Sequence, residues 1–284
     1  MYTKRMWRAG KTIDVQKSYC YPCQLIGGKI VKAKRQKPFR KSKAAQVKYN
    51  QVCRERAIIR LVNTNFTQGD LYITLKYTAG SRPDVPQAKE DKRRFLRALR
   101  DICRKEGQPL RYVFTTEIGE RGGIHHHAII GSMDVRAVEK LWKRATEGRG
   151  NLHFEFLYGG DFSKLAKYFV GERCSDLAGS SRKESSKEKR YSTSQGLKRP
   201  QAEKVQKIKA DSWRQQPTAP KGYYVDPDSV CEGINPVTGH GYQFYRLIKI
   251  EDGETRPRRG GDPARSTADD RKELQKNCIK FAKN

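Results

Sequence analysis

The sequence has no long apolar run and few acidic residues to balance its basic ones. No stretch approaches the roughly 18 consecutive apolar residues of a membrane helix, and the N-terminus has no apolar signal core. The seven cysteines are an odd number without the spacing of a disulfide framework. No glycine-rich loop ends in Lys-Ser/Thr, so a fused helicase is not expected. We therefore expect a cytoplasmic protein with reduced thiols and no membrane partner.

The charge is strongly one-sided. The 284 residues contain 60 Lys and Arg against 31 Asp and Glu, a formal net charge of +29. Such a balance favours polyanions, and we predict nucleic acid ahead of the competing membrane surface. The basic run Lys32–Lys43 would serve as a phosphate-contacting arm through Arg35 and Arg40, and Lys76 and Arg121 are further candidate DNA-binding residues. Cys20 and Cys23 have the spacing of half a zinc site, but no second pair follows at finger distance.

Three of only five histidines stand together at 125–127. Side chains alternate across a strand, so His125 and His127 should share one face and His126 the other. Segments 110–118 and 124–131 are typical of two strands, and the glycine-rich turn between them predicts a hairpin that brings Glu117 beside the histidines. A carboxylate and two imidazoles leave coordination positions open, which suits a catalytic divalent ion. The alternative is a surface strand whose histidines are merely polar.

The order of predicted elements is that of an α+β fold with a mainly antiparallel sheet flanked by helices. Strands are expected at 70–77, 110–118, 124–131 and 151–157, with helices at 88–106 and 134–146. A short helix capped at Asp161 should follow, with Phe162, Leu165, Ala166 and Phe169 as its buried stripe. Tyr168 lies off that stripe, with Lys164 one turn earlier on the same side. Amphipathic packing is the alternative role for this tyrosine.

These motifs resemble the HUH endonucleases, especially the rolling-circle replication initiators of small circular phages and plasmids. The resemblance covers roughly residues 70–250 and rests on the order of acid, paired histidines and tyrosine. It implies a ferredoxin- or RRM-like fold, one Mg²⁺ or Mn²⁺ held by Glu117, His125 and His127, and Tyr168 as nucleophile. A hydrophobic residue usually stands where this chain has His126. The family's lysine three residues after the tyrosine is replaced by Gly171, so Lys164 or Lys167 would take its role.

The resemblance also implies the reaction and the partners. Tyrosine attack on single-stranded origin DNA would give a 5′-phosphotyrosine and a free 3′-hydroxyl, which a host polymerase can extend with the help of a host helicase. Two alternatives stay open: a non-catalytic DNA- or RNA-binding protein, and a related single-strand transposase or relaxase. Relaxases place the tyrosine before the histidines, so the order here favours the initiators.

Composition suggests five regions. We expect a basic N-terminal segment at 1–57, the endonuclease domain at 58–172, a linker at 173–190, an accessory aromatic and basic region at 191–250, and a disordered tail at 251–284. Within the accessory region we predict a basic helix near 201–210 and strands near 222–226 and 241–250. The aromatic residues there would stack DNA bases or, alternatively, pack against the nuclease sheet.

Overall fold

The computed structural model describes residues 1–27, 29–33, 43–119, 122–171, 174–175 and 190–250. The chain divides into a unit Met1–Lys249, which contains every described helix and strand, and a unit Ile250–Asn284. The helices are α1 (Lys43–Asn65), α2 (Val85–Lys105), α3 (Val135–Ala145) and α4 (Ser163–Tyr168). The strands are β1 (Tyr2–Ala9), β2 (Thr12–Ile26), β3 (Lys29–Lys32), β4 (Leu71–Tyr77), β5 (Tyr112–Ile118), β6 (Ile124–Ile130), β7 (Gly150–Phe156), β8 (Cys174–Ser175), β9 (Ser192–Thr193), β10 (Gln206–Ile208), β11 (Tyr223–Ile234) and β12 (His240–Lys249).

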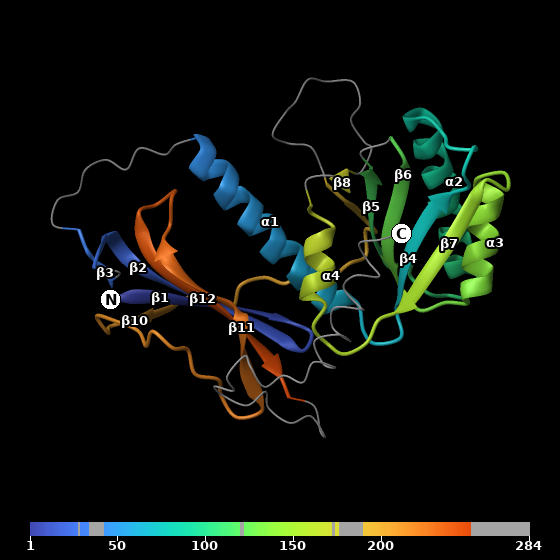
Figure 1. The fold of residues 1–284 in the computed structure, drawn as a ribbon. Helices are drawn as coiled ribbons and strands as arrows, with labels where there is room; N and C mark the ends of the chain where they lie inside the picture. Colours follow the sequence, from blue (N-terminus) through green and yellow to red (C-terminus); the bar gives the residue numbers. More distant parts are fainter. Residues whose placement is uncertain (28, 34–42, 120–121, 172–173, 176–189, 251–284) are drawn as a thin grey trace, which may run out of the picture. The chain divides into compact units, whose positions relative to one another are not determined.

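One of the two sheets, here called the core sheet, has the strand order β7-β4-β6-β5-β8, with β9 also paired to β5. All of its pairings are antiparallel. The chain order β4-α2-β5-β6-α3-β7 with these neighbours is the ferredoxin-like arrangement. The predicted α+β class, with an antiparallel sheet flanked by helices, is confirmed (Figure 1).

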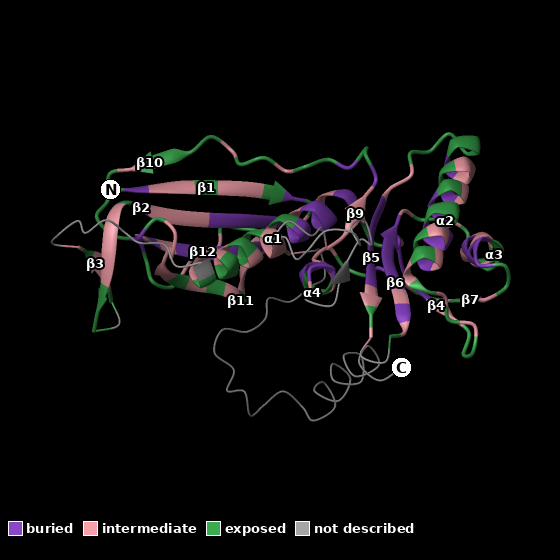
Figure 2. Ribbon diagram, turned by 90° about the horizontal axis from the view of Figure 1, so that it is seen from above, coloured by how far each residue is buried: buried purple, intermediate pink, exposed green. Residues whose placement is uncertain are grey.

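Helices cover both faces of the core sheet (Figure 1). On one face Leu71 and Ile73 of β4 pack in a cluster with Phe95 of α2 and Trp142 of α3. On the other face the next residue of β4, Tyr72, belongs to a cluster built from α1 and α4. Figure 2 shows the buried residues concentrated in β5, β6 and parts of these helices. Strand alternation therefore splits the hydrophobic core into two layers, one on each side of the sheet.

The second sheet, here called the terminal sheet, has the order β10-β1-β2-β12-β11, with β3 paired to β2. It joins the first residues of the chain to residues more than 200 positions later, because β2 pairs with β12 along most of its length. One face buries Ile13 and Val15 of β2 against Tyr245 and Leu247 of β12. This layer has no partner within the N-terminal segment itself.

The terminal sheet differs from the predicted organisation. Residues 1–57 were expected to form a basic segment and 191–250 a separate accessory region, whereas β1–β3 and β10–β12 build one sheet. The basic side chains of β1 and β2 alternate with apolar ones, and this alternation acquires a buried side only when β12 is paired alongside. Helix α1 also runs across the boundary expected at residues 57 and 58.

The predicted basic helix near 201–210 is wrong, because residues 206–208 form strand β10. This segment has no apolar stripe that a helix would bury, and most of its residues are exposed. Its backbone instead pairs with the edge of β1, at Tyr2–Lys4. The strands expected near 222–226 and 241–250 are present as β11 and β12, and β11 continues to Ile234. The arm at 34–42, most of the linker and the tail lie outside the described residues.

Helix α1 contacts both sheets. Its C-terminal half contributes Ile58 and Val62 to the core-sheet cluster. Near the same end, the β1–β2 turn approaches so closely that a Cβ atom at Gly10 would lie 1.9 Å from the carbonyl oxygen of Asn63. Gly10 also has a positive φ of 58°, so two independent constraints favour glycine there.

Candidate active site

The candidate site is built on the β5–β6 hairpin. Glu117 is the direct cross-strand partner of His125, and Thr115 is the partner of His127. The turn closes through a hydrogen bond of 2.8 Å from the Gly119 backbone N–H to the Gly123 carbonyl, and through Gly122 at φ 71°. The hairpin predicted from the glycine-rich turn is thus present, and Glu117 shares a sheet face with the two outer histidines.

His126 faces the opposite side of the sheet and is completely buried. Its Nδ1 lies 2.8 Å from the Thr116 hydroxyl, its Nε2 lies 3.1 Å from the Tyr77 hydroxyl, and its ring meets Trp142 edge-on. Burial lowers the pKa of His126 well below its ordinary value, and the nearby Lys92 charge adds to this. His126 is therefore a neutral core residue, separated by the sheet from the candidate site.

Three functional groups meet on the other face. The Tyr168 hydroxyl donates a hydrogen bond to Glu117 Oε2 and lies 3.1 Å from His127 Nε2. Glu117 Oε2 and His127 Nε2 are themselves 3.6 Å apart. The structure thus brings together a residue from β5, one from β6 and one from α4, as the sequence predicted for an acid, a histidine and a tyrosine of one site.

The orientation of His127 depends on β4. Its Nδ1 lies 2.9 Å from the Tyr72 hydroxyl and 3.3 Å from the Thr74 hydroxyl, which leaves Nε2 directed towards Tyr168 and Glu117. Sequence reasoning missed both residues. The alternation of β4 was visible, but only the pairing of Thr74 with His127 shows which face of β4 borders the site.

The electrostatics favour an ionised carboxylate beside neutral imidazole. The hydrogen bond from His127 lowers the pKa of Glu117 to about 2, and the Tyr168 hydrogen bond acts in the same direction against the opposing effect of burial. Burial lowers the pKa of His125, with a further contribution from the positive charge of Lys76. At neutral pH Glu117 therefore carries a negative charge and His125 is neutral, the states in which both groups bind metal.

A divalent ion fits this donor set in part. Glu117 and His127 supply the oxygen and nitrogen donors that Mg²⁺ or Mn²⁺ and related ions accept, and they already lie close together. His125 is on the same face, but its Nε2 lies beside Gly123 and Arg82. Among the described residues no group of three His, Cys, Asp or Glu side chains lies close enough to hold an ion jointly. The third predicted ligand would have to turn towards the other two.

The remaining candidate residues are placed as follows. Lys164 and Lys167 are exposed on α4, the helix that carries Tyr168. Lys76 lies on β4 near enough to His125 to influence its pKa. Arg35, Arg40 and Arg121 lie outside the described residues.

Helix α4 has its buried side as predicted, but its N-terminal cap differs. Phe162, Ala166 and Phe169 are buried, and Leu165 packs against the same cluster. The cap position is Phe162 instead of Asp161, and the Asp161 carboxylate accepts a hydrogen bond from the Ser163 backbone N–H at 3.1 Å. Tyr168 is 38% exposed and stands at the end of the helix.

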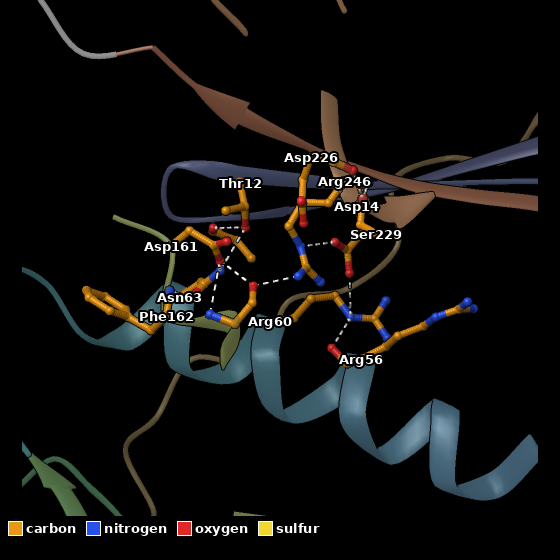
Figure 3. Close-up of polar contacts among 12 residues, drawn as sticks. Thr12, Asp14, Arg56, Arg60, Asn63, Asp161, Phe162, Asp226, Ser229 and Arg246 are labelled. Carbon is orange, nitrogen blue, oxygen red and sulfur yellow. Dashed lines mark hydrogen bonds and ion pairs between the residues drawn. The ribbon is translucent and has the colours of Figure 1, made fainter. Parts of the chain in front are cut away.

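A polar network that sequence reasoning did not find holds the start of α4 (Figure 3). From α1, Asn63 donates to Asp161 Oδ1 at 3.0 Å and accepts from the Phe162 backbone N–H at 2.9 Å. From β12, buried Arg246 donates to Ser163 Oγ at 2.5 Å and to Asp14 of β2 at 2.8 Å. The terminal sheet and α1 therefore both contact the helix that carries Tyr168.

We expect Asn63→Ala to lower the free energy of unfolding by about 1–3 kcal/mol, because it leaves the buried Phe162 N–H without its acceptor. Urea unfolding followed by circular dichroism measures the loss. Asn151→Ala is the matched control, since that exposed asparagine makes one long hydrogen bond to Thr78, and its change should stay within about 0.5 kcal/mol. Equal stability of the two variants would contradict the anchoring role of Asn63.

Comparison with known families identifies the same part of the chain. Residues 70–172 match the family model of the replication-associated proteins of the ORF2 type. The matched segment extends from β4 to just beyond α4 and contains Glu117, His125, His127 and Tyr168. The match supports a replication-associated protein resembling rolling-circle initiators. No curated protein and no solved structure matches the chain. None of the described helices is both long and apolar enough to span a membrane.

Proposed function

We propose that this protein initiates rolling-circle DNA replication as an HUH-type endonuclease that nicks and rejoins single-stranded origin DNA. The observation that supports this most directly is the Tyr168 hydroxyl lying within hydrogen-bonding distance of both Glu117 and His127. The replication-associated family match over the same residues supports it independently.

In the proposed reaction the Tyr168 oxygen attacks the scissile phosphorus. The bond from phosphorus to the 3′-oxygen breaks as the bond to tyrosine forms, which leaves a 5′-phosphotyrosine and a 3′-oxygen that takes up a proton. Glu117 and His127 are both placed to accept the phenolic proton. A tyrosine of ordinary pKa near 10 is a weak nucleophile at neutral pH, so removal of this proton is an essential contribution of the site.

Glu117 and His127, with His125 after reorientation, would hold the Mg²⁺ or Mn²⁺ ion. Such an ion would polarise the phosphate and stabilise its developing charge. Lys164 or Lys167 is proposed to stabilise the phenolate or the leaving oxygen once DNA is bound. The free 3′-hydroxyl would be the primer for a host polymerase working with a host helicase, and attack by a 3′-hydroxyl on the phosphotyrosine would rejoin the strand.

The test is formation of a covalent protein–DNA adduct. The protein is incubated with single-stranded DNA and Mg²⁺ or Mn²⁺, and tryptic peptides are analysed by mass spectrometry. We expect one adduct on the peptide that contains Tyr168, dependent on added metal and abolished by a chelator. DNA binding without any adduct or cleavage, over a panel that includes origin DNA from the source replicon, would favour the non-catalytic alternative.

DNA affinity is expected to depend strongly on salt, because a net charge of +29 contributes mainly through phosphates. Raising the salt concentration from about 50 to about 200 mM should weaken binding by more than about tenfold. Tyr168→Phe should show the same dependence, since the hydroxyl adds no charge. Fluorescence anisotropy with a labelled oligonucleotide measures both proteins, and an affinity insensitive to salt would contradict the electrostatic contribution.

A further inference from the structure

A second candidate site lies away from the hairpin, between α1 and the terminal sheet. The N-terminal half of α1 and the sheet enclose a cavity of about 240 Å³. Lys48, Tyr49 and Arg56 line it from α1, Gln16 and Tyr242 line it from β2 and β12, and Asn235 lines it from the turn between β11 and β12.

The cavity follows from the way α1 meets the terminal sheet. Tyr49, Val52 and Arg56 are three and four residues apart, so they lie on one face of the helix. One turn further on, Arg60 lies 3.7 Å from the buried carboxylate of Asp14, which brings the helix against the sheet. Towards the N-terminal end no such ion pair closes the space among the described residues, and Val52 is still 38% exposed. The result is a hollow that remains open to a ligand.

The lining combines positive charge with flat ring surfaces. Lys48 and Arg56 supply two cations, and none of the residues lining the described wall of the cavity is acidic. The Arg56 guanidinium lies 3.7 Å from the centre of the Phe244 ring, and its Nη2 donates to Cys231 Sγ at 3.3 Å. Both contacts hold the guanidinium in one orientation. Tyrosine rings and a fixed guanidinium plane are the surfaces on which unpaired bases stack.

We propose that this cavity binds one base of single-stranded DNA, with Tyr49 and Tyr242 providing the stacking surface and Lys48 and Arg56 neutralising the adjoining phosphates. The choice of DNA rests on the proposed replication function, while the need for an aromatic base and a phosphate rests on the lining alone. The volume lies below the roughly 300–1,000 Å³ of sites for larger ligands, which fits a single base.

The cavity-lining part of α1 also contacts the end of α4. Gln51, two residues after Tyr49, donates to the Val170 carbonyl at 3.2 Å, just beyond the helix that carries Tyr168. One continuous DNA strand is thus expected to contact both the cavity and the candidate active site. In that case the cavity supplies affinity for DNA through a base that does not react.

The experiment compares two labelled oligonucleotides of equal length and charge, one oligothymidylate and one with abasic sites throughout. Binding is measured by fluorescence anisotropy in full-length Tyr168→Phe protein, so that no cleavage interferes. We expect the parent to prefer oligothymidylate. Tyr49→Ala should reduce oligothymidylate affinity by about 5- to 150-fold and leave abasic affinity unchanged, because stacking of one base is lost. Tyr49→Phe keeps the ring and should retain the preference.

Lys48→Ala tests the phosphate contact and should weaken binding of both oligonucleotides. Its matched control is Lys140→Ala, which removes the same charge from an exposed position on α3. Tyr49 lies half-exposed on a helix, so its replacement should leave the thermal unfolding of the protein nearly unchanged. An unchanged oligothymidylate preference in Tyr49→Ala would overturn the proposal. Adduct formation by protein with Tyr168 intact is scored separately, so failure of the nicking reaction and failure of the cavity give different results.

Discussion

Tyr168→Phe is expected to abolish both strand cleavage and the covalent adduct while leaving the fold and DNA affinity nearly intact. The substitution removes the single oxygen that contacts Glu117 and His127. The ring stays, and with it the edge-on contacts to His127 and Phe169. Adduct formation, cleavage on a denaturing gel and thermal unfolding are measured on the same preparation, because only this combination separates lost chemistry from lost structure.

Tyr158→Phe is the matched control. Tyr158 precedes α4, is 74% exposed and would be the nearest alternative nucleophile by sequence. Tyr191, the other flanking tyrosine, packs against the core-sheet cluster, and burial raises its pKa, which makes it a poorer nucleophile. An adduct that persists in Tyr168→Phe and disappears in Tyr158→Phe would show that the wrong tyrosine has been assigned to the reaction.

The second large effect is expected at His127, where replacement by alanine should reduce cleavage by at least about a hundredfold. The imidazole Nε2 lies 3.1 Å from the Tyr168 hydroxyl and 3.6 Å from Glu117, so its loss removes a proton acceptor and a metal donor at once. Single-turnover cleavage at saturating DNA measures this effect without a contribution from binding. A variant with an unchanged cleavage rate would exclude His127 from the reaction.

His126→Leu provides the contrasting neighbour. This histidine is fully buried on the far side of the sheet, where it contacts Thr116 and Tyr77. Its replacement should lower the free energy of unfolding by about 1–3 kcal/mol, because two buried hydroxyl groups lose a partner. Under conditions where the variant remains folded, cleavage should continue at a rate close to that of the unmodified protein. Loss of cleavage in folded His126→Leu would contradict the assignment of the two histidines to opposite faces.

The sequence was sufficient for the core sheet and for the face on which the site lies. Strand alternation placed His125 and His127 on one side and His126 on the other, and the glycine-rich turn placed Glu117 opposite His125. These relationships depend on residues that are close in the chain, where backbone geometry alone fixes direction. The pairing of Tyr168 with Glu117 was proposed from the resemblance, and its geometry was supplied by the fold.

Other features were decided only by tertiary structure. Residues 1–32 looked like a basic segment, because the strand that buries their apolar side, β12, lies more than 200 residues later. Arg246 and Asn63 carry no local pattern that connects them to α4, yet both hold its first residues. The cavity beside Tyr49 likewise depends on where α1 leaves the terminal sheet. Local sequence sets which face a side chain takes, whereas contacts between distant segments form only where the whole chain buries enough surface to fix them.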